Sequence, residues 1–297
     1  MSRTERRARK AAAVAERMAP GGRYIDVPGR GELYVREAGG PRRAPTLVLL
    51  HGLGATAALN WDAALPTLAR RHRVVAPDLR GHGRGPRCDG RFRLEDCVDD
   101  VAALIETVAG PVVLVGYSMG GAVAQLVAYR RPDLLSGLVL CATARDFRGR
   151  PTERLRFGVL GGLAVATHLT PDWWPSLLPP VLRERSFVPP LVGELGGHQS
   201  RAVLAAAASL GTFTSREWIG DVTVPSAVVV TRHDGLVPVR RQRKLAEALG
   251  APVVEVDGNH FVAHRHPDRL AEALLQAVDL LPRRPRKPRS PSRSKAA

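Results

Sequence analysis

The sequence predicts an α/β fold with a mainly parallel, twisted sheet that is covered by helices on both faces. Three observations predict it. Short apolar runs typical of buried strands recur along the chain, and segments with helical spacing of apolar residues lie between them. Such alternation is typical of parallel sheets. Glycine-rich or polar segments follow several of the apolar runs, which is where parallel sheets carry their functional loops.

In the first part of the chain, we expect four strands and three helices. The strands are residues 30–37, 46–50, 73–76 and 111–115, and the helices are residues 65–71, 94–108 and 121–130. The helix at 94–108 is the best defined, because its apolar residues fall on one face. These residues are Leu94, Cys97, Val101, Leu104, Ile105 and Val108.

The later part of the chain repeats the pattern around an insertion. Apolar runs at 138–142, 227–231 and 252–256 predict three more strands, and residues 239–249 and 268–280 predict helices. Residues 145–220 contain no clear strand but many prolines and short apolar pieces. A structureless loop of that length is improbable. We therefore expect a helical lid at 145–220, between two core segments at 21–144 and 221–281.

The positive charge is concentrated at the two ends. The chain has a net charge of +16, of which residues 1–18 contribute +4 and residues 282–297 contribute +7. We expect a basic extension at 1–20 and a disordered, Pro/Arg-rich tail at 282–297. Two interpretations stay open, a solvated end and weak contact with an anionic membrane. The body lacks an element that reads nucleic acid, so no specific nucleic-acid partner is expected.

Composition also bears on the compartment. The three cysteines have no metal-binding spacing, and their odd number is typical of reduced thiols. No segment has the roughly 20 apolar residues needed to span a bilayer. Residues 1–18 lack the long apolar stretch of a secretory signal. The sequence therefore predicts a cytoplasmic protein.

Ser118 is the strongest candidate for chemistry. It lies in the segment G-Y-S-M-G at 116–120, directly after one predicted strand and before a predicted helix. This setting is typical of a nucleophile elbow, a turn so sharp that the serine side chain is exposed on its tip. Flanking glycines are needed because larger side chains would clash there. The bare pattern arises by chance in about one such sequence in eight, so the strand–turn–helix setting carries the prediction.

A nucleophilic serine needs a histidine to take its proton and a carboxylate to orient that histidine. Asp234 and His260 each follow a predicted strand, in the chain order expected for this architecture. Asp234 also precedes a glycine, so a plain Asp-Gly turn is the alternative interpretation. His264 and His266 are rivals for the base, but they lie beyond the strand end.

An oxyanion hole completes such a site, because preorganised N–H groups must meet the charge that develops on the substrate oxygen. The N–H of Met119, beside the nucleophile at a helix start, is one expected donor. Leu53, in the segment H-G-L-G after the second predicted strand, supplies the other. The loop with Asp78, Arg80 and His82 is expected to be structural, tying strand ends together through hydrogen bonds.

Together these segments resemble the α/β-hydrolase family. The matching pieces are H-G-L-G at 51–54, D-L-R-G-H-G at 78–83, G-Y-S-M-G-G at 116–121, Asp234 with L-V-P at 236–238, and G-N-H at 258–260 with Pro267. The resemblance covers residues 21–144 and 221–281. It implies Ser118 as nucleophile, His260 as base and Asp234 as its partner. Some members carry the acid after the strand before the lid, near Asp146.

The resemblance also narrows the reaction. The family's epoxide hydrolases and haloalkane dehalogenases have an aspartate nucleophile, so Ser118 argues against both. We expect hydrolysis of a carboxylic ester through an acyl-enzyme, with no metal or organic cofactor. The same triad could cleave a C–C bond, a thioester or a lactone, or transfer an acyl group. A ligand-binding receptor that has kept its triad is the alternative from another class.

The expected substrate is a small ester with an apolar acyl or ring group. Apolar residues of the predicted lid, including Trp173 and Trp174, suggest a hydrophobic pocket, and Trp61 is placed near its mouth. The alternative is that these side chains only seal the lid onto the core.

Overall fold

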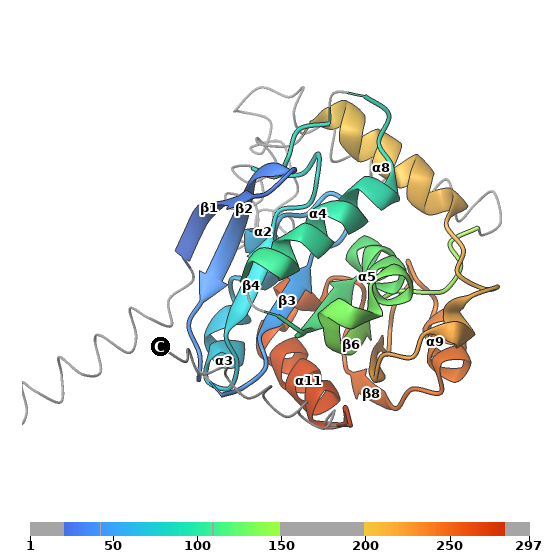
Figure 1. Ribbon diagram of the computed structural model, residues 1–297. Coiled ribbons are helices and arrows are strands. Elements are labelled where there is room, and N and C mark those ends of the chain that lie inside the picture. Colours follow the sequence, from blue (N-terminus) through green and yellow to red (C-terminus); the bar gives the residue numbers. More distant parts are fainter. Residues whose placement is uncertain (1–20, 42, 89, 109, 149–198, 283–297) are drawn as a thin grey trace, which may run out of the picture.

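The computed structural model describes residues 21–41, 43–88, 90–108, 110–148 and 199–282. It contains an eight-stranded sheet in the order β1-β2-β4-β3-β5-β6-β7-β8 (Figure 1). The strands are β1 Gly21–Val27, β2 Gly31–Ala38, β3 Leu47–Leu50, β4 Val74–Pro77, β5 Val112–Tyr117, β6 Leu135–Cys141, β7 Ser226–Thr231 and β8 Val253–Val256. Strand β2 pairs antiparallel with both neighbours, and the strands from β4 to β8 are parallel.

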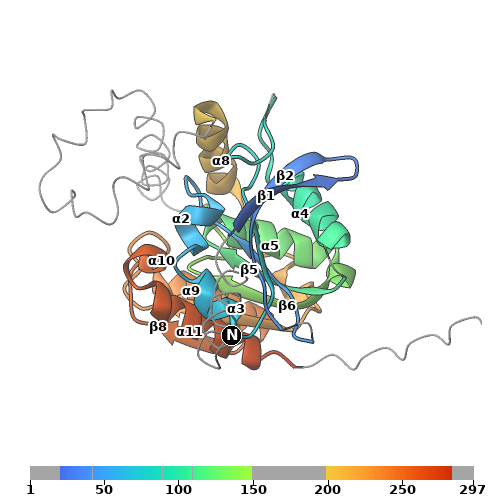
Figure 2. The same ribbon diagram turned by 90° about the vertical axis from the view of Figure 1, so that its left-hand side faces the viewer.

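Helices cover both faces of this sheet (Figures 1 and 2). They are α2 Ala57–Trp61, α3 Leu65–Ala69, α4 Leu94–Val108, α5 Met119–Arg130, α8 Ser200–Thr212, α9 Val239–Leu249, α10 Val262–Arg265 and α11 Pro267–Asp279, with short 3₁₀ turns at Pro132–Leu134 and Ile219–Asp221. Helices α4, α5 and α9 pack on one face, and α2, α3, α10 and α11 pack on the other. The predicted fold class is confirmed.

The core consists of two apolar layers, because side chains alternate between the faces of a strand. In β3, Val48 and Leu50 belong to the layer under α4 and α5, whereas Leu47 and Leu49 belong to the layer under α3 and α11. All four are fully buried. Burying one such side chain stabilises the fold by about 1.5–3 kcal/mol, so a strand buried on both faces must be apolar throughout.

Strand β1 and the short helices α2 and α10 were not expected from the sequence. Strand β1 lies at the sheet edge, where only Ile25 and Val27 are buried, so its apolar pattern is weak. Helix α2 has five residues, which is too few for a helical repeat to be recognised. By contrast, the bounds of α4 and α9 agree with the expected helices at 94–108 and 239–249.

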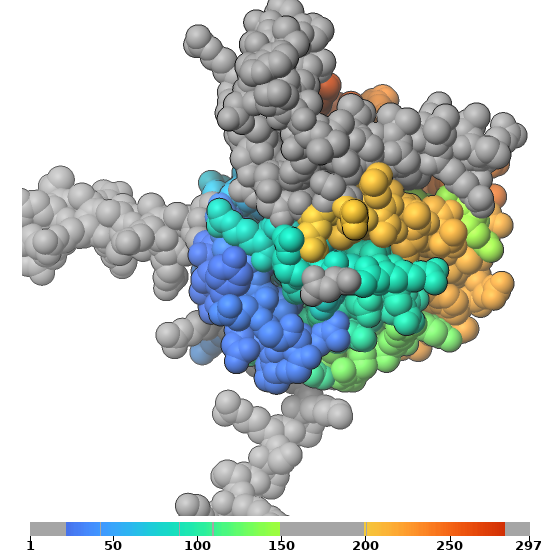
Figure 3. All heavy atoms as spheres, turned by 90° about the horizontal axis from the view of Figure 1, so that it is seen from above, coloured from blue at the N-terminus to red at the C-terminus, as the bar shows by residue number. Residues whose placement is uncertain are grey.

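Of the predicted lid segment at 145–220, residues 145–148 and 199–220 are described, and they include helix α8. It packs on the loop that follows β4 (Figure 3, where α8 is yellow). The Gln199 N–H donates to the Gly81 carbonyl at 3.1 Å, and the Cys88 N–H donates to Gln199 Oε1 at 2.6 Å. The basic ends and most of the predicted lid, including Trp173 and Trp174, lie outside the described residues. No helix within the described ranges is long and apolar enough to cross a bilayer.

Candidate active site

Ser118 occupies a strained turn between β5 and α5. Its backbone has φ 52° and ψ −115°, a combination that residues other than glycine rarely adopt. Such a conformation costs on the order of 1–3 kcal/mol and persists only where surrounding contacts fix it. The Ser118 N–H donates to the Cys141 carbonyl at 3.0 Å, and Thr143 Oγ1 donates to the Ser118 carbonyl at 2.8 Å. Contacts with β6 and the loop after it therefore hold the turn.

Close packing explains the glycines around Ser118. A Cβ at Gly116 would lie 2.5 Å from the Gly120 carbonyl oxygen, and one at Gly120 would lie 2.5 Å from the Leu50 carbonyl oxygen. A Cβ at Gly121 would lie 2.5 Å from Thr143 Cγ2. The glycines thus let α5 begin directly against β3 and the loop after β6.

The structure brings His260 between Ser118 and Asp234. His260 Nε2 lies 3.0 Å from Ser118 Oγ, and His260 Nδ1 lies 2.8 Å from Asp234 Oδ2. The three residues follow β5, β7 and β8, which are parallel and therefore end at the same edge of the sheet. Because the carboxylate only accepts hydrogen bonds, Nδ1 carries the proton and Nε2 is free to accept from the serine hydroxyl.

The Asp234 carboxylate is buried, and protein groups donate hydrogen bonds to both of its oxygens. Oδ1 accepts from the N–H groups of Leu236 and Val237, at 2.9 and 2.8 Å. Oδ2 accepts from Thr231 Oγ1 at 2.8 Å and from Gln242 Nε2 at 3.2 Å, in addition to His260. These donors offset the cost of burying a charge without an arginine or lysine partner among the described residues.

Gln242 connects Asp234 to the fold and was not singled out from the sequence. It is fully buried on α9; its Nε2 also donates to Thr231 Oγ1 and to the Val237 carbonyl, both at 2.8 Å. Its Oε1 accepts from the Thr231 N–H at 3.1 Å. A sequence signal existed, because Gln242 shares the apolar face of its helix with Leu245 and Leu249. A polar residue on a buried face needs partners, and here the partners belong to the site.

Tyr117 links the nucleophile turn to the histidine loop. Its hydroxyl donates to the His260 carbonyl at 2.6 Å, and burial raises the pKa of this phenol well above its usual value. The ring packs edge-to-face on Trp61, with centroids 5.9 Å apart. Trp61 is fully buried there, so it supports the wall behind the histidine loop. Its contribution to a substrate pocket stays a prediction.

The segment after β3 lies against Ser118, where the second oxyanion donor is expected. A Cβ at Gly52 would be 3.4 Å from Ser118 Cβ. The Gly52 N–H donates to Asn60 Oδ1 at 3.0 Å, and His51 Nε2 accepts from the Leu79 N–H at 2.9 Å. These buried contacts fix the loop that carries Leu53. The Met119 N–H belongs to the first residue of α5 and so has no acceptor within its own helix.

The rival residues have other surroundings. His264 lies in α10, where partial burial lowers its pKa to about 4, and His266 occupies the N-cap position of α11 without a capping hydrogen bond from its side chain. Asp146 pairs with Arg216 at 2.7 Å and Arg148 at 3.3 Å. The acid that contacts His260 is therefore Asp234.

The loop after β4 is held together by the hydrogen bonds expected from the sequence. Asp78 accepts from the N–H groups of Ala57 and Arg84, at 2.7 and 2.9 Å. Arg80 forms a bidentate ion pair with buried Asp100, in which Nε and Nη2 each donate to one carboxylate oxygen at 2.8 Å. His82 is fully buried, and its pKa falls to about 3 because of that burial and the neighbouring His51 ring. Within the described residues, no group of three His, Cys, Asp or Glu side chains is arranged to hold a metal ion.

A serine, a histidine and a buried carboxylate in hydrogen-bonding order, at the strand ends of this sheet, define the class of α/β hydrolases. Comparison with known proteins agrees. The sequence pattern of the alpha/beta hydrolase family matches residues 47–273. The chain belongs to this family.

Relatives within the family differ in their reactions. The 2-(acetamidomethylene)succinate hydrolase of Mesorhizobium japonicum is 28% identical over 269 residues, covering 86% of this chain and 95% of that protein. The pimeloyl-[acyl-carrier protein] methyl ester esterase of Vibrio atlanticus is 26% identical over 249 residues, covering 78% and 91%. The solved enol-lactonase of Burkholderia xenovorans LB400 has a TM-score of 0.69 and 24% identity, covering 86% and 100%. At 24% identity, the similarity to the enol-lactonase shows a shared fold only.

Proposed function

We propose that this chain is a serine hydrolase that cleaves a carboxylic ester, with Ser118 as nucleophile, His260 as general base and acid, and Asp234 as its orienting partner. The observation that carries the proposal is the position of His260, whose two ring nitrogens contact Ser118 Oγ and Asp234 Oδ2. An unassisted serine hydroxyl is a weak nucleophile, and this arrangement supplies the missing base.

In the acylation half, Ser118 Oγ attacks the ester carbonyl carbon while its proton moves to His260 Nε2. The resulting imidazolium keeps its Nδ1–H directed at Asp234, whose charge stabilises it. When the tetrahedral intermediate collapses, the Nε2 proton goes to the leaving alkoxide oxygen. The alcohol departs, and the acyl group stays on Ser118 as an ester.

In the second half, a water molecule replaces the alcohol. His260 Nε2 takes a proton from the water as its oxygen attacks the acyl carbon, and then returns a proton to Ser118 Oγ. The carboxylic acid departs and the free serine is restored. The N–H groups of Leu53 and Met119 would stabilise the oxyanion in both halves, and losing one such donor typically costs about 3–4 kcal/mol of transition-state stabilisation.

The ester bond is favoured among the reactions that this triad supports. The relative named as a methyl ester esterase acts on such a bond, and it matches most of this chain. The hydrolase of 2-(acetamidomethylene)succinate has similar coverage, so the family likeness alone leaves the bond type open. A C–C bond, thioester or lactone would use the same nucleophile and oxyanion donors.

The test is activity on a series of short p-nitrophenyl esters, with wild type and Ser118→Ala compared. We expect turnover in the wild type, and a loss of about 10⁴-fold or more in the variant. A fluorophosphonate probe should label the wild type at Ser118 and leave the variant unlabelled. Equal turnover in both proteins would refute the proposed nucleophile. A cleavable diketone assayed beside the esters separates C–C bond cleavage from ester hydrolysis.

A further inference from the structure

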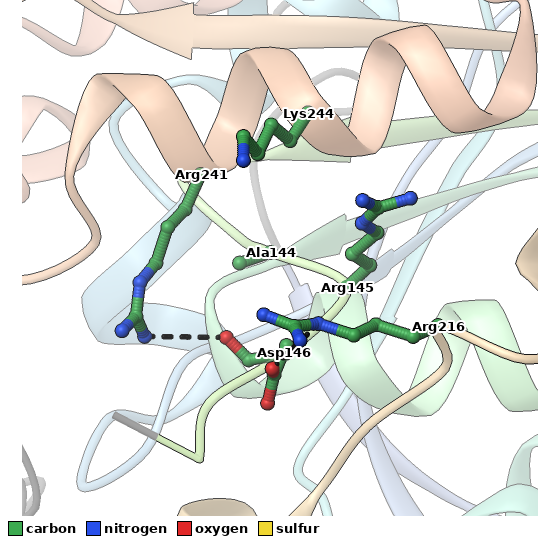
Figure 4. Close-up of a pocket in the computed structure, with 6 residues that line it drawn as sticks. All are labelled: Ala144, Arg145, Asp146, Arg216, Arg241 and Lys244. Carbon is green, nitrogen blue, oxygen red and sulfur yellow. Dashed lines mark hydrogen bonds and ion pairs between the residues drawn. The ribbon is translucent and has the colours of Figure 1, made fainter. Parts of the chain in front are cut away.

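A hollow lined by basic side chains lies beside the loop that follows β6, and its described lining does not include Ser118, His260 or Asp234 (Figure 4). Arg241 and Lys244 extend from α9 on one side, and Arg216 reaches in from the segment after α8. The loop itself contributes residues 144–146. Among the described residues that line the hollow, four cationic side chains thus lie together with one carboxylate, that of Asp146.

That carboxylate is already neutralised. Asp146 lies 2.7 Å from Arg216 and 3.3 Å from Arg148, and its backbone carbonyl accepts from Arg241 Nη1 at 3.3 Å. Among the described residues, Arg145 and Lys244 have no carboxylate within ion-pair distance. The described lining of the hollow therefore has an excess of positive charge, and a concave surface lined by one sign of charge concentrates counter-ions.

The cationic side chains are partly or largely exposed, but buried hydrogen bonds hold the backbone segments that carry two of them, Arg145 and Arg216. Gln125 is fully buried, and its Nε2 donates to the Ala144 carbonyl at 3.1 Å. Ser215, also fully buried, donates from its N–H to the Arg145 carbonyl at 2.7 Å and from Oγ to Gln125 Oε1 at 2.7 Å. The loop and the segment before Arg216 are thereby tied to each other and to α5.

Helix α9 forms the remaining wall, and it is held through Gln242, whose amide contacts Thr231 and Asp234. The cations therefore project from three segments whose backbones are fixed in advance. Preorganised donors lose little entropy when a ligand binds. Arginine guanidinium groups match the planar or tetrahedral oxygens of carboxylate and phosphate groups, and a lysine ammonium adds a point charge.

From this geometry we infer that the hollow formed by Arg145, Arg216, Arg241 and Lys244 is a binding site for an oxyanion group, a phosphate or a carboxylate. The group has two conceivable sources. It is either a free anion that binds independently of the reaction, or the charged end of a substrate whose ester lies at Ser118. The second source rests on the proposed function, and the first does not.

The first experiment measures binding without turnover. Wild type is titrated with inorganic phosphate by calorimetry, against chloride at matched ionic strength. We expect saturable binding of phosphate, weakened about tenfold or more in the double variant Arg145→Gln/Lys244→Gln. The matched control is Arg70→Gln/Arg240→Gln, which removes the same charge from exposed positions outside the hollow. Its affinity should stay within about twofold of wild type.

Two results would overturn the site. One is the absence of saturable phosphate binding to the wild type above the chloride background. The other is an equal loss of affinity in both double variants, which would assign the binding to net charge. Circular dichroism and the thermal midpoint establish that each variant is folded before its affinity is compared.

A second experiment identifies the source of the group. Esters of matched length, whose acyl chains end in a carboxylate or in a methyl group, are compared in wild type and Arg145→Gln/Lys244→Gln. A KM that rises about tenfold for the carboxylate ester alone assigns the hollow to the substrate. Unchanged KM for both esters, together with the phosphate binding lost in the variant, assigns it to a free anion. Lack of any turnover refutes the proposed function and leaves the binding result intact.

Discussion

Gln242 offers a sharp test of how the fold supports the site. In Gln242→Leu the side-chain volume is nearly conserved, but the Thr231 N–H and the Val237 carbonyl lose a buried partner. Each such group costs about 1–3 kcal/mol when it is left unsatisfied, so the free energy of unfolding should fall by about 2–6 kcal/mol. This loss of stability alone would not distinguish a structural residue from a positioning residue.

The distinguishing quantity is kcat. Asp234 Oδ2 loses the Gln242 donor at 3.2 Å, and the Thr231 hydroxyl, which donates to the same oxygen, loses the amide that orients it. A hydrogen bond to a charged group contributes about 1.5–3 kcal/mol, and this one is at the long end of its range. We expect kcat to fall about tenfold with little change in KM, because the loss acts on the orientation of His260 and not on substrate contacts.

Gln125→Leu is the matched control. Gln125 is equally buried, and its Nε2 donates to the Gly121 and Ala144 carbonyls at 3.1 Å each, but it contacts none of the three triad residues. Its removal should lower stability by a similar amount, measured by urea unfolding, and leave kcat within about threefold of wild type. Equal effects of the two variants on kcat would refute the reasoning, as would full kcat in destabilised Gln242→Leu.

Three further predictions address the proposed triad, the turn at Ser118 and the partly buried His264. Asp234→Asn should lower kcat by about 10⁴-fold in ester assays, because an amide at this position favours the wrong tautomer of His260; a loss below tenfold would contradict the assigned role. Gly121→Ala should lower the free energy of unfolding by about 1–3 kcal/mol, because its Cβ would lie 2.5 Å from Thr143. The control is Gly211→Ala, which has open space around the new Cβ and should be neutral or stabilising by up to about 1 kcal/mol. Equal urea midpoints of the two variants would contradict this prediction. Burial lowers the pKa of His264 from its ordinary value of 6.5 to about 4, so the unfolded chain binds this proton first and stability should fall as pH drops from about 6.5 to 4. The fall should be smaller by about 2–3 kcal/mol in His264→Gln, and parallel pH profiles of the two proteins would contradict it.

The parts of the site that the sequence predicted are those set by position along a strand. Ser118, Asp234 and His260 each follow an apolar run, and parallel strands end at one edge, so their proximity follows from the topology. The expected structural role of Asp78 and Arg80 follows from the same principle, since polar groups at strand ends need partners.

The parts that the sequence did not predict depend on which distant side chain meets which. Nothing local indicates that the Tyr117 hydroxyl reaches the His260 carbonyl, or that Gln242 on α9 reaches Asp234. Strand β1 was not predicted for another reason, because an edge strand needs few apolar residues. The basic hollow could not be predicted from the sequence either, because its cationic residues come from three separate segments.

The left-handed backbone of Ser118 has an evolutionary consequence. A glycine at position 118 would relieve the backbone strain of the turn, but it would carry no hydroxyl. Under the proposed function, this substitution would remove the attacking hydroxyl and end turnover. Selection for activity would then keep a strained residue at a position whose backbone suits glycine.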